Sequence, residues 1–167
     1  KSLRTLELAG PDVMDSTLEM LELPKLNRLI IRESDEITNS GLAHLPGRFP
    51  ELQELSFIYC NSIADAGLVH VAKMDSLRSL SIQEHLYGEF HITNVGMSHI
   101  ENLGLHTLRL NHCGITDAGL DSISRLPLHT LNLTGCGITK NGLPRISKMP
   151  LLRTLSLRSN YKLTGSL

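Results

Sequence analysis

Apolar residues recur along this chain in two alternating patterns, the first of which predicts strands. Seven short segments read L-x-x-L-x-L, where x is mostly polar, and a period of two is typical of a half-buried strand. The segments begin at Leu3, Leu26, Leu52, Leu77, Leu105, Leu128 and Leu152, so each starts 23 to 28 residues after the one before. Self-similarity at a nearly fixed period indicates a repeat architecture.

The second pattern follows the strand segments and predicts short helices. Its consensus is Ile-Thr-Asp-x-Gly-Leu, as at residues 115–120, and Thr or Asp there is a favourable helix N-cap. The apolar residues then switch to a spacing of three, which places them on one helical face, and prolines end several of the helices. The pattern covers residues 37–42, 63–68, 92–97, 115–120 and 138–143, and the prolines are Pro46, Pro50, Pro127 and Pro150.

One strand and one short helix cannot bury their apolar faces alone, whereas stacked copies can. We therefore predict an α/β fold: a right-handed solenoid of about seven repeats, with a concave parallel sheet and short helices on the convex side. Residues 1–167 form a single domain in this interpretation. Terminal repeats normally carry polar caps, and neither end of this sequence has one, so we expect the domain to be a fragment of a longer chain.

The repeat unit L-x-x-L-x-L-x-x-C/N-x(n)-I-T-D-x-G-L resembles the cysteine-containing subclass of leucine-rich repeats. F-box substrate receptors and related bacterial and protist proteins contain this subclass, and the resemblance covers essentially the whole chain. It implies the fold strongly and the function only loosely, because leucine-rich repeats serve many unrelated tasks. These 167 residues contain no F-box helices that would support a ubiquitin-ligase role.

The ninth place of the repeat contains cysteine, histidine and small polar residues, which raises the question of a zinc site. Neighbouring parallel strands are about 4.8 Å apart, so Cys60 and Cys136 would be separated by about 14 Å, too far to share a metal ion. In-register side chains also disfavour a Cys113–Cys136 disulfide. We therefore predict an inward structural ladder that satisfies buried backbone groups. Its members are Ser34, Cys60, His85, Cys113, Cys136 and Asn160.

Composition and motifs exclude several functional classes. The net charge of −1 argues against a nucleic-acid-binding protein, and no run of about 18 apolar residues could span a membrane. Phosphate-binding, metalloprotease and serine-hydrolase motifs are absent, so we expect no catalysis, cofactor or metal. Three cysteines are an odd number for a disulfide framework, which favours the cytoplasm, or the host cytoplasm for a secreted effector. We expect a monomer.

The outward places of the strands vary from repeat to repeat and form the expected binding surface. Arginine, a frequent interface cation, is concentrated there, and from the fifth repeat onward no acidic residue faces it, which favours an acidic segment of a partner. The long loop of the fourth repeat adds aromatic side chains, which either form a binding rim or fold back as a plug. The expected contact residues are Arg28, Ile30, Arg32, Glu54, Ile58, Tyr59, Gln83, Tyr87, Phe90, Arg109, His112 and Arg158.

These observations favour non-catalytic recognition of a protein partner, in which the domain selects the partner for a larger protein such as a ligase receptor or a bacterial effector. Two alternatives remain open at this point. One is an extracellular receptor-type domain, although paired disulfide caps are missing. The other is an accessory domain of an enzyme whose catalytic part lies elsewhere.

Overall fold

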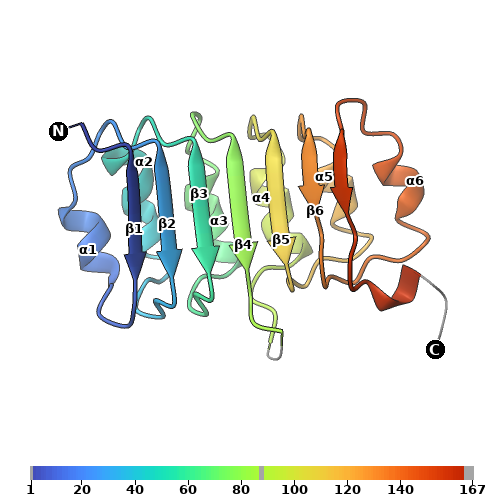
Figure 1. Cartoon of the computed structure of the whole chain (residues 1–167), viewed down its shortest axis with the longest axis horizontal. Helices are drawn as coiled ribbons and strands as arrows, with labels where there is room; N and C mark the ends of the chain where they lie inside the picture. The colour runs from blue at the N-terminus through green and yellow to red at the C-terminus, as the bar shows by residue number, and fades with distance from the viewer. Residues whose placement is uncertain (1, 87–88, 164–167) are drawn as a thin grey trace.

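Seven parallel strands form one sheet, with the short helices behind it (Figure 1). The structure, a computed structural model, describes residues 2–86 and 89–163. Strand order follows chain order from β1 to β7, as the repeat pattern predicts. The strands are β1 (Thr5–Ala9), β2 (Arg28–Arg32), β3 (Glu54–Ile58), β4 (Ser79–Gln83), β5 (Thr107–Asn111), β6 (Thr130–Asn132) and β7 (Thr154–Ser156).

Each strand is followed by a short helical segment. The α-helices are α1 (Asp15–Met20), α2 (Leu45–Arg48), α3 (Asp65–Val71), α4 (Asn94–Ile100), α5 (Leu120–Ile123) and α6 (Leu143–Ile146). Two 3-10 turns, η1 (Gly41–His44) and η2 (Tyr161–Leu163), complete the helical segments. Helices of four to seven residues are not stable alone, so their packing against the sheet and against each other stabilises them.

The core consists of columns of equivalent apolar residues. Leu55, Leu80 and Leu108 lie in register on adjacent strands and are at most 1% exposed. Burying a leucine of this kind contributes about 1.5–3 kcal/mol. The equivalent Leu155 of β7 is 43% exposed, because within the described residues β7 pairs with a strand on one side only, that of β6. Stacking of repeats is thus what buries each leucine.

Beneath the strand ends, the inward side chains of the ninth place form hydrogen bonds with backbone carbonyls. Ser34 Oγ donates to the carbonyl oxygens of Arg32 and Gly10 at 2.8 and 3.0 Å. The thiols of Cys60, Cys113 and Cys136 each donate to one carbonyl of their own repeat and one of the preceding repeat. Asn160 Nδ2 donates to three carbonyls, and its Oδ1 accepts from Ile138 N at 2.9 Å.

The prediction that His85 belongs to this inward ladder is wrong. His85 is exposed and stacks on Tyr59, with ring centroids 4.4 Å apart. The preceding Glu84 takes the inward position instead, and its Oε1 accepts hydrogen bonds from His91 N and Ile92 N at 2.7 and 3.3 Å. The longer loop of the fourth repeat explains this change, because its additional backbone N–H groups require an acceptor rather than a donor.

A second set of hydrogen bonds joins the helical sides of adjacent repeats. The carboxylate of Asp15 accepts from both the backbone N–H and the hydroxyl of Thr38 in the next repeat, each at 2.7 Å. Asp65 and Asp117 make the same pair of bonds to the threonine of the following repeat. The aspartate of the Ile-Thr-Asp-x-Gly-Leu motif therefore binds the next copy of the motif instead of capping its own helix. The predicted N-cap is found at Thr93, whose side chain accepts from Val95 N at 3.2 Å, whereas the N-caps of α3, α5 and α6 are Ala64, Gly119 and Gly142.

Candidate functional site: the open sheet face

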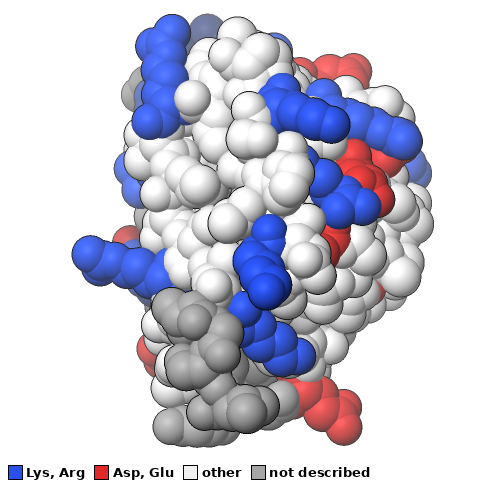
Figure 2. Space-filling view, turned by 90° about the vertical axis from the view of Figure 1, so that its right-hand side faces the viewer, with Lys and Arg blue, Asp and Glu red and all other residues white. Residues whose placement is uncertain are grey.

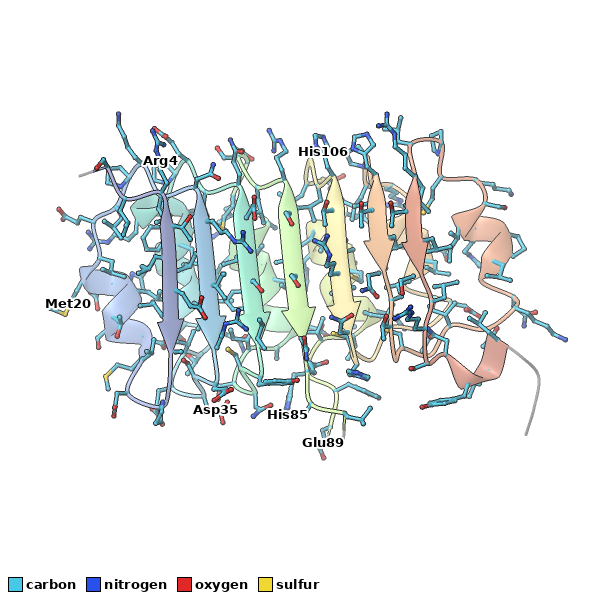
Figure 3. All side chains as sticks on the ribbon, in the orientation of Figure 1. Arg4, Met20, Asp35, His85, Glu89 and His106 are labelled. Carbon is cyan, nitrogen blue, oxygen red and sulfur yellow. The ribbon has the colours of Figure 1, made fainter. Side chains whose placement is uncertain are left out.

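The surface that is free to bind a partner is the sheet face that the helices do not cover, which we call the open face. Three rows of outward side chains cross it in strand register, for example Ser56, Ser81 and Arg109. Figure 3 shows Arg4 and His106 at the edge where the strands begin, and Asp35, His85 and Glu89 at the opposite edge. The predicted contact residues on the strands thus share one continuous surface.

In the first half of this face, arginines are neutralised by glutamates. Arg28 and Glu54 lie in register on β2 and β3 and form an ion pair at 3.5 Å. Arg32 pairs with Glu7 of β1. Arg4 pairs with Glu51 at 3.2 Å. These charges are largely satisfied within the domain.

The second half of the face carries arginines without such partners. Arg109, Arg153 and Arg158 are exposed and form no ion pair with any residue that the structure describes. Figure 2, which looks onto the C-terminal end, shows Lys and Arg side chains there, some beside Asp or Glu side chains and some apart from them. This half of the open face is therefore a surface of uncompensated positive charge.

Nearby carboxylates are occupied elsewhere. Glu101 pairs with Arg125 at 2.6 Å and Asp121 pairs with Arg145, both on the helical side. Asp117 binds Thr139, and Glu84 is turned inward to its loop. Burial raises the pKa of Glu84, although its hydrogen bonds from the loop and the nearby His91 act in the opposite direction. The arginines of β5–β7 consequently form no ion pair with these carboxylates.

The edge of the fourth repeat combines aromatic rings with exposed apolar groups. Tyr59 stacks on His85, and its hydroxyl accepts a hydrogen bond from Gln83 Nε2 at 2.5 Å. Leu86 and Phe90 are both exposed, at 58% and 52%. The Cβ of Phe90 nevertheless lies close to Gly114 of the next repeat. Phe90 thus both packs on the solenoid and presents a ring to solvent. Tyr87 lies outside the described residues.

Two of the predicted aliphatic contacts differ in accessibility. Ile30 lies on the open face in register with Glu7 and Ser56 but is only 8% exposed. Its expected role as an exposed aliphatic contact is therefore wrong. Ile58, near the end of β3, is partly exposed.

The backbone at the end of the strands controls where several side chains lie. His112, Tyr59 and Glu33 have φ angles of 58°, 57° and 51°, a left-handed conformation that glycine adopts at Gly10 and Gly135. A Cβ on Gly135 of the next repeat would lie 2.2 Å from His112 Nδ1. The imidazole of His112 therefore occupies the space that a side chain at position 135 would need. Gly135 therefore positions His112 at the lower margin of the open face.

Two hollows open on this face. The first measures about 220 Å³, is floored by Ser56, Ser79 and Ser81, and contains the Arg28–Glu54 pair beside Arg109. The second measures about 340 Å³ and lies across the ends of β4–β7. Seven polar residues line this second hollow, which we call the polar hollow: Gln83, Asn111, His112, Asn132, Thr134, Ser156 and Arg158.

Sequence reasoning selected three of the seven residues of the polar hollow, namely Gln83, His112 and Arg158, and passed over the other four. The available signal was the run of uncharged polar residues at outward places of β5–β7. The imidazole rings of His106 and His129 lie 5.0 Å apart at the edge where the strands begin. Neither histidine was assigned to a site from the sequence.

The three cysteines are free thiols. Burial raises the pKa of Cys113 well above its usual value and raises that of Cys136 to about 11. Cys60 is less buried, and its pKa is raised mainly by the same desolvation. Because the thiolate is the reactive form, these groups serve structure rather than chemistry.

Comparison with known proteins agrees with the repeat pattern. A family profile described as "Leucine Rich repeat" matches residues 101–124 and 127–146. The crystal structure of an internalin from Listeria monocytogenes is similar to the chain with a TM-score of 0.61 and 22% sequence identity. The match covers 96% of this chain and 53% of the internalin chain, so the present chain spans about half the length of that protein.

Within the described residues, no helix is long and apolar enough to cross a membrane. The seven in-register strands, their short helices and the internalin likeness together identify the fold as a leucine-rich-repeat solenoid.

Proposed function

We propose that this domain is a non-catalytic protein-recognition module whose open face binds an extended, acidic segment of a partner protein. The observation that carries the proposal is the presence of unpaired, exposed Arg109 and Arg158 on the open face, with unpaired, exposed Arg153 at the edge where the strands begin. Arginine is favoured at interfaces because its planar guanidinium donates several hydrogen bonds in a fixed geometry. A partner carboxylate would supply the counter-charge that the glutamates supply in the first half.

The rigidity of the solenoid supports the same function. Strand register and the contacts between repeats fix the outward side chains before binding, so little conformational entropy is lost on association. The edge of Tyr59, His85 and Phe90 adds exposed aromatic surface next to the charged half, a combination typical of interface hot spots. Within a longer protein, such a module would select the partner on which another domain acts.

The free thiols bear on where the protein works. Cys60, Cys113 and Cys136 donate hydrogen bonds as thiols, a function that disulfide formation would remove. We therefore place the domain in a reducing compartment, the cytoplasm of its own cell or of a host cell.

A display library of random nine-residue peptides tests the proposed function without a known partner. We expect peptides with acidic runs to be enriched, and their affinity to fall as salt screens the charges. The double variant Arg109→Glu/Arg158→Glu should abolish binding. The matched control Lys140→Glu/Lys148→Glu makes the same change in net charge at exposed positions on the helical side and should leave binding intact.

Enrichment of peptides without acidic residues would contradict the proposal. Equal loss of binding in both double variants would also contradict it, because net charge rather than the open face would then control binding.

A further inference from the structure

We infer that the polar hollow is an anchor subsite for one carboxylate side chain, an aspartate or glutamate of the bound segment. This inference rests on the proposed function and deepens it, because it assigns one ligand group to one place on the open face. The lining contains no acidic and no apolar residue. Sites for organic ligands and cofactors are predominantly apolar, so a polar side chain accompanied by water fits this lining better.

Two side chains of the polar hollow, Asn132 and Arg158, keep free hydrogen-bond donors, whereas Gln83 donates to Tyr59 and Thr134 donates to Asn132. Asn132 Oδ1 accepts from Thr134 N at 2.9 Å and from Thr134 Oγ1 at 2.6 Å. The free edge of this amide is therefore its NH₂ group, with two donors. The guanidinium of Arg158 forms no hydrogen bond or ion pair with the described part of the chain, so its five N–H donors remain available. The free donors of Asn132 and Arg158 favour an anionic ligand.

The hollow is also incomplete in its own hydrogen bonding. Asn111 Oδ1 is buried and accepts no hydrogen bond from any described residue. Buried polar atoms are normally paired, by protein, water or ligand.

The charge of the hollow distinguishes a carboxylate from a phosphoryl group. One guanidinium, that of Arg158, faces the hollow, together with the imidazole of His112. Phosphoryl groups carry about two negative charges and are typically bound by clusters of arginines. A single guanidinium matches the single charge and the two-oxygen geometry of a carboxylate.

Small probes test the hollow directly, independently of peptide selection. In NMR titrations, N-acetyl-glutamate N-methylamide should cause saturable shifts of the Asn132 side-chain NH₂ and Arg158 Nε–H signals. The uncharged N-acetyl-glutamine N-methylamide should cause none. The shifts should disappear in Arg158→Gln and persist in Arg153→Gln, which removes an exposed arginine outside the hollow.

Asn132→Asp provides a second, size-matched variant. It retains the oxygen that accepts from Thr134, so the local structure is preserved, but it replaces the two donors with negative charge. We expect it to weaken binding of the glutamate probe at least about tenfold, as does the loss of a hydrogen bond to a charged group. A peptide selected by display should lose affinity when one particular acidic residue is made an amide, and this loss should vanish in Arg158→Gln.

Three outcomes of the titrations, besides the absence of any shift, would overturn the inference. One is equal shifts from the glutamate and glutamine probes, and another is shifts spread evenly over Arg109, Arg153 and Arg158. The third is much tighter binding of N-acetyl-phosphoserine N-methylamide, which would assign the hollow to a phosphoryl group. If acidic peptides bind while the glutamate probe leaves the hollow unperturbed, the proposed function stands and the anchor subsite falls. If no acidic peptide is selected, the proposed function itself fails.

Discussion

Gly41 should be intolerant of even one added methyl group, because the aspartate of the preceding repeat occupies that space. A Cβ on Gly41 would lie 2.0 Å from Asp15 Oδ1 and 2.6 Å from Asp15 Cγ, and all three close atoms belong to Asp15. The substitution Gly41→Ala therefore forces the carboxylate to move. The movement breaks the two hydrogen bonds of 2.7 Å from Asp15 to Thr38 that join the first two repeats.

The expected loss of stability is about 2–4 kcal/mol, since hydrogen bonds to charged groups contribute about 1.5–3 kcal/mol each and these are partly exposed to solvent. The reduced entropy of the unfolded chain offsets about 0.4–1 kcal/mol of this loss. In an Asp15→Ala background the two bonds are already gone, and the nearest remaining atom is Asp15 Cβ at 3.2 Å. Gly41→Ala should then cost little, which gives a coupling free energy of about 2 kcal/mol between the two positions.

Urea unfolding of the wild type, both single variants and the double variant measures this coupling, with unchanged m-values as the check on comparable transitions. Gly47→Ala is the matched control, because a Cβ there meets no atom within 4 Å. It should be neutral or slightly stabilising. The reasoning would be refuted if Gly41→Ala were as mild as Gly47→Ala, or if its cost were the same with and without the Asp15 carboxylate.

Three further predictions concern the inward side chains. Burial raises the pKa of Glu84, so the folded state holds this proton more tightly than the unfolded state, and the wild type should lose stability as pH rises from about 4 to neutrality. Over that range the melting temperature of Glu84→Gln should rise relative to that of the wild type. A constant difference between the two melting temperatures would contradict this. A thiol reagent at pH 8 should modify Cys60 first and Cys113 only after unfolding, whereas equal rates in the native protein would refute the assignment of burial. Asn160→Ala should lower the free energy of unfolding by about 3 kcal/mol, because it leaves three carbonyls and one N–H without their partner. Cys136→Ser keeps a donor and should lower it by less than about 1 kcal/mol. Similar losses in both variants, measured by chemical unfolding, would argue against the ladder.

The binding that we propose depends on side chains whose location could be predicted from the sequence but whose ion pairing could not. The outward location of Arg28 and Arg109 follows from strand alternation. Their difference does not, since Arg28 is paired across the sheet with Glu54 whereas Arg109 forms no ion pair with any described residue. Pairing depends on which side chains neighbour each other across strands and on where the carboxylates turn.

The sequence by itself determined the repeat, the order and direction of the strands, and the columns of buried leucine, because these follow from local periodicity and from the need to bury apolar surface by stacking. Only the tertiary structure decided the features that join different repeats. It turned Glu84 inward in place of His85, covered Ile30, and bound Asp15 to Thr38. These contacts link residues that are distant along the chain, and their outcome depends on space and hydrogen-bond geometry that no local pattern records.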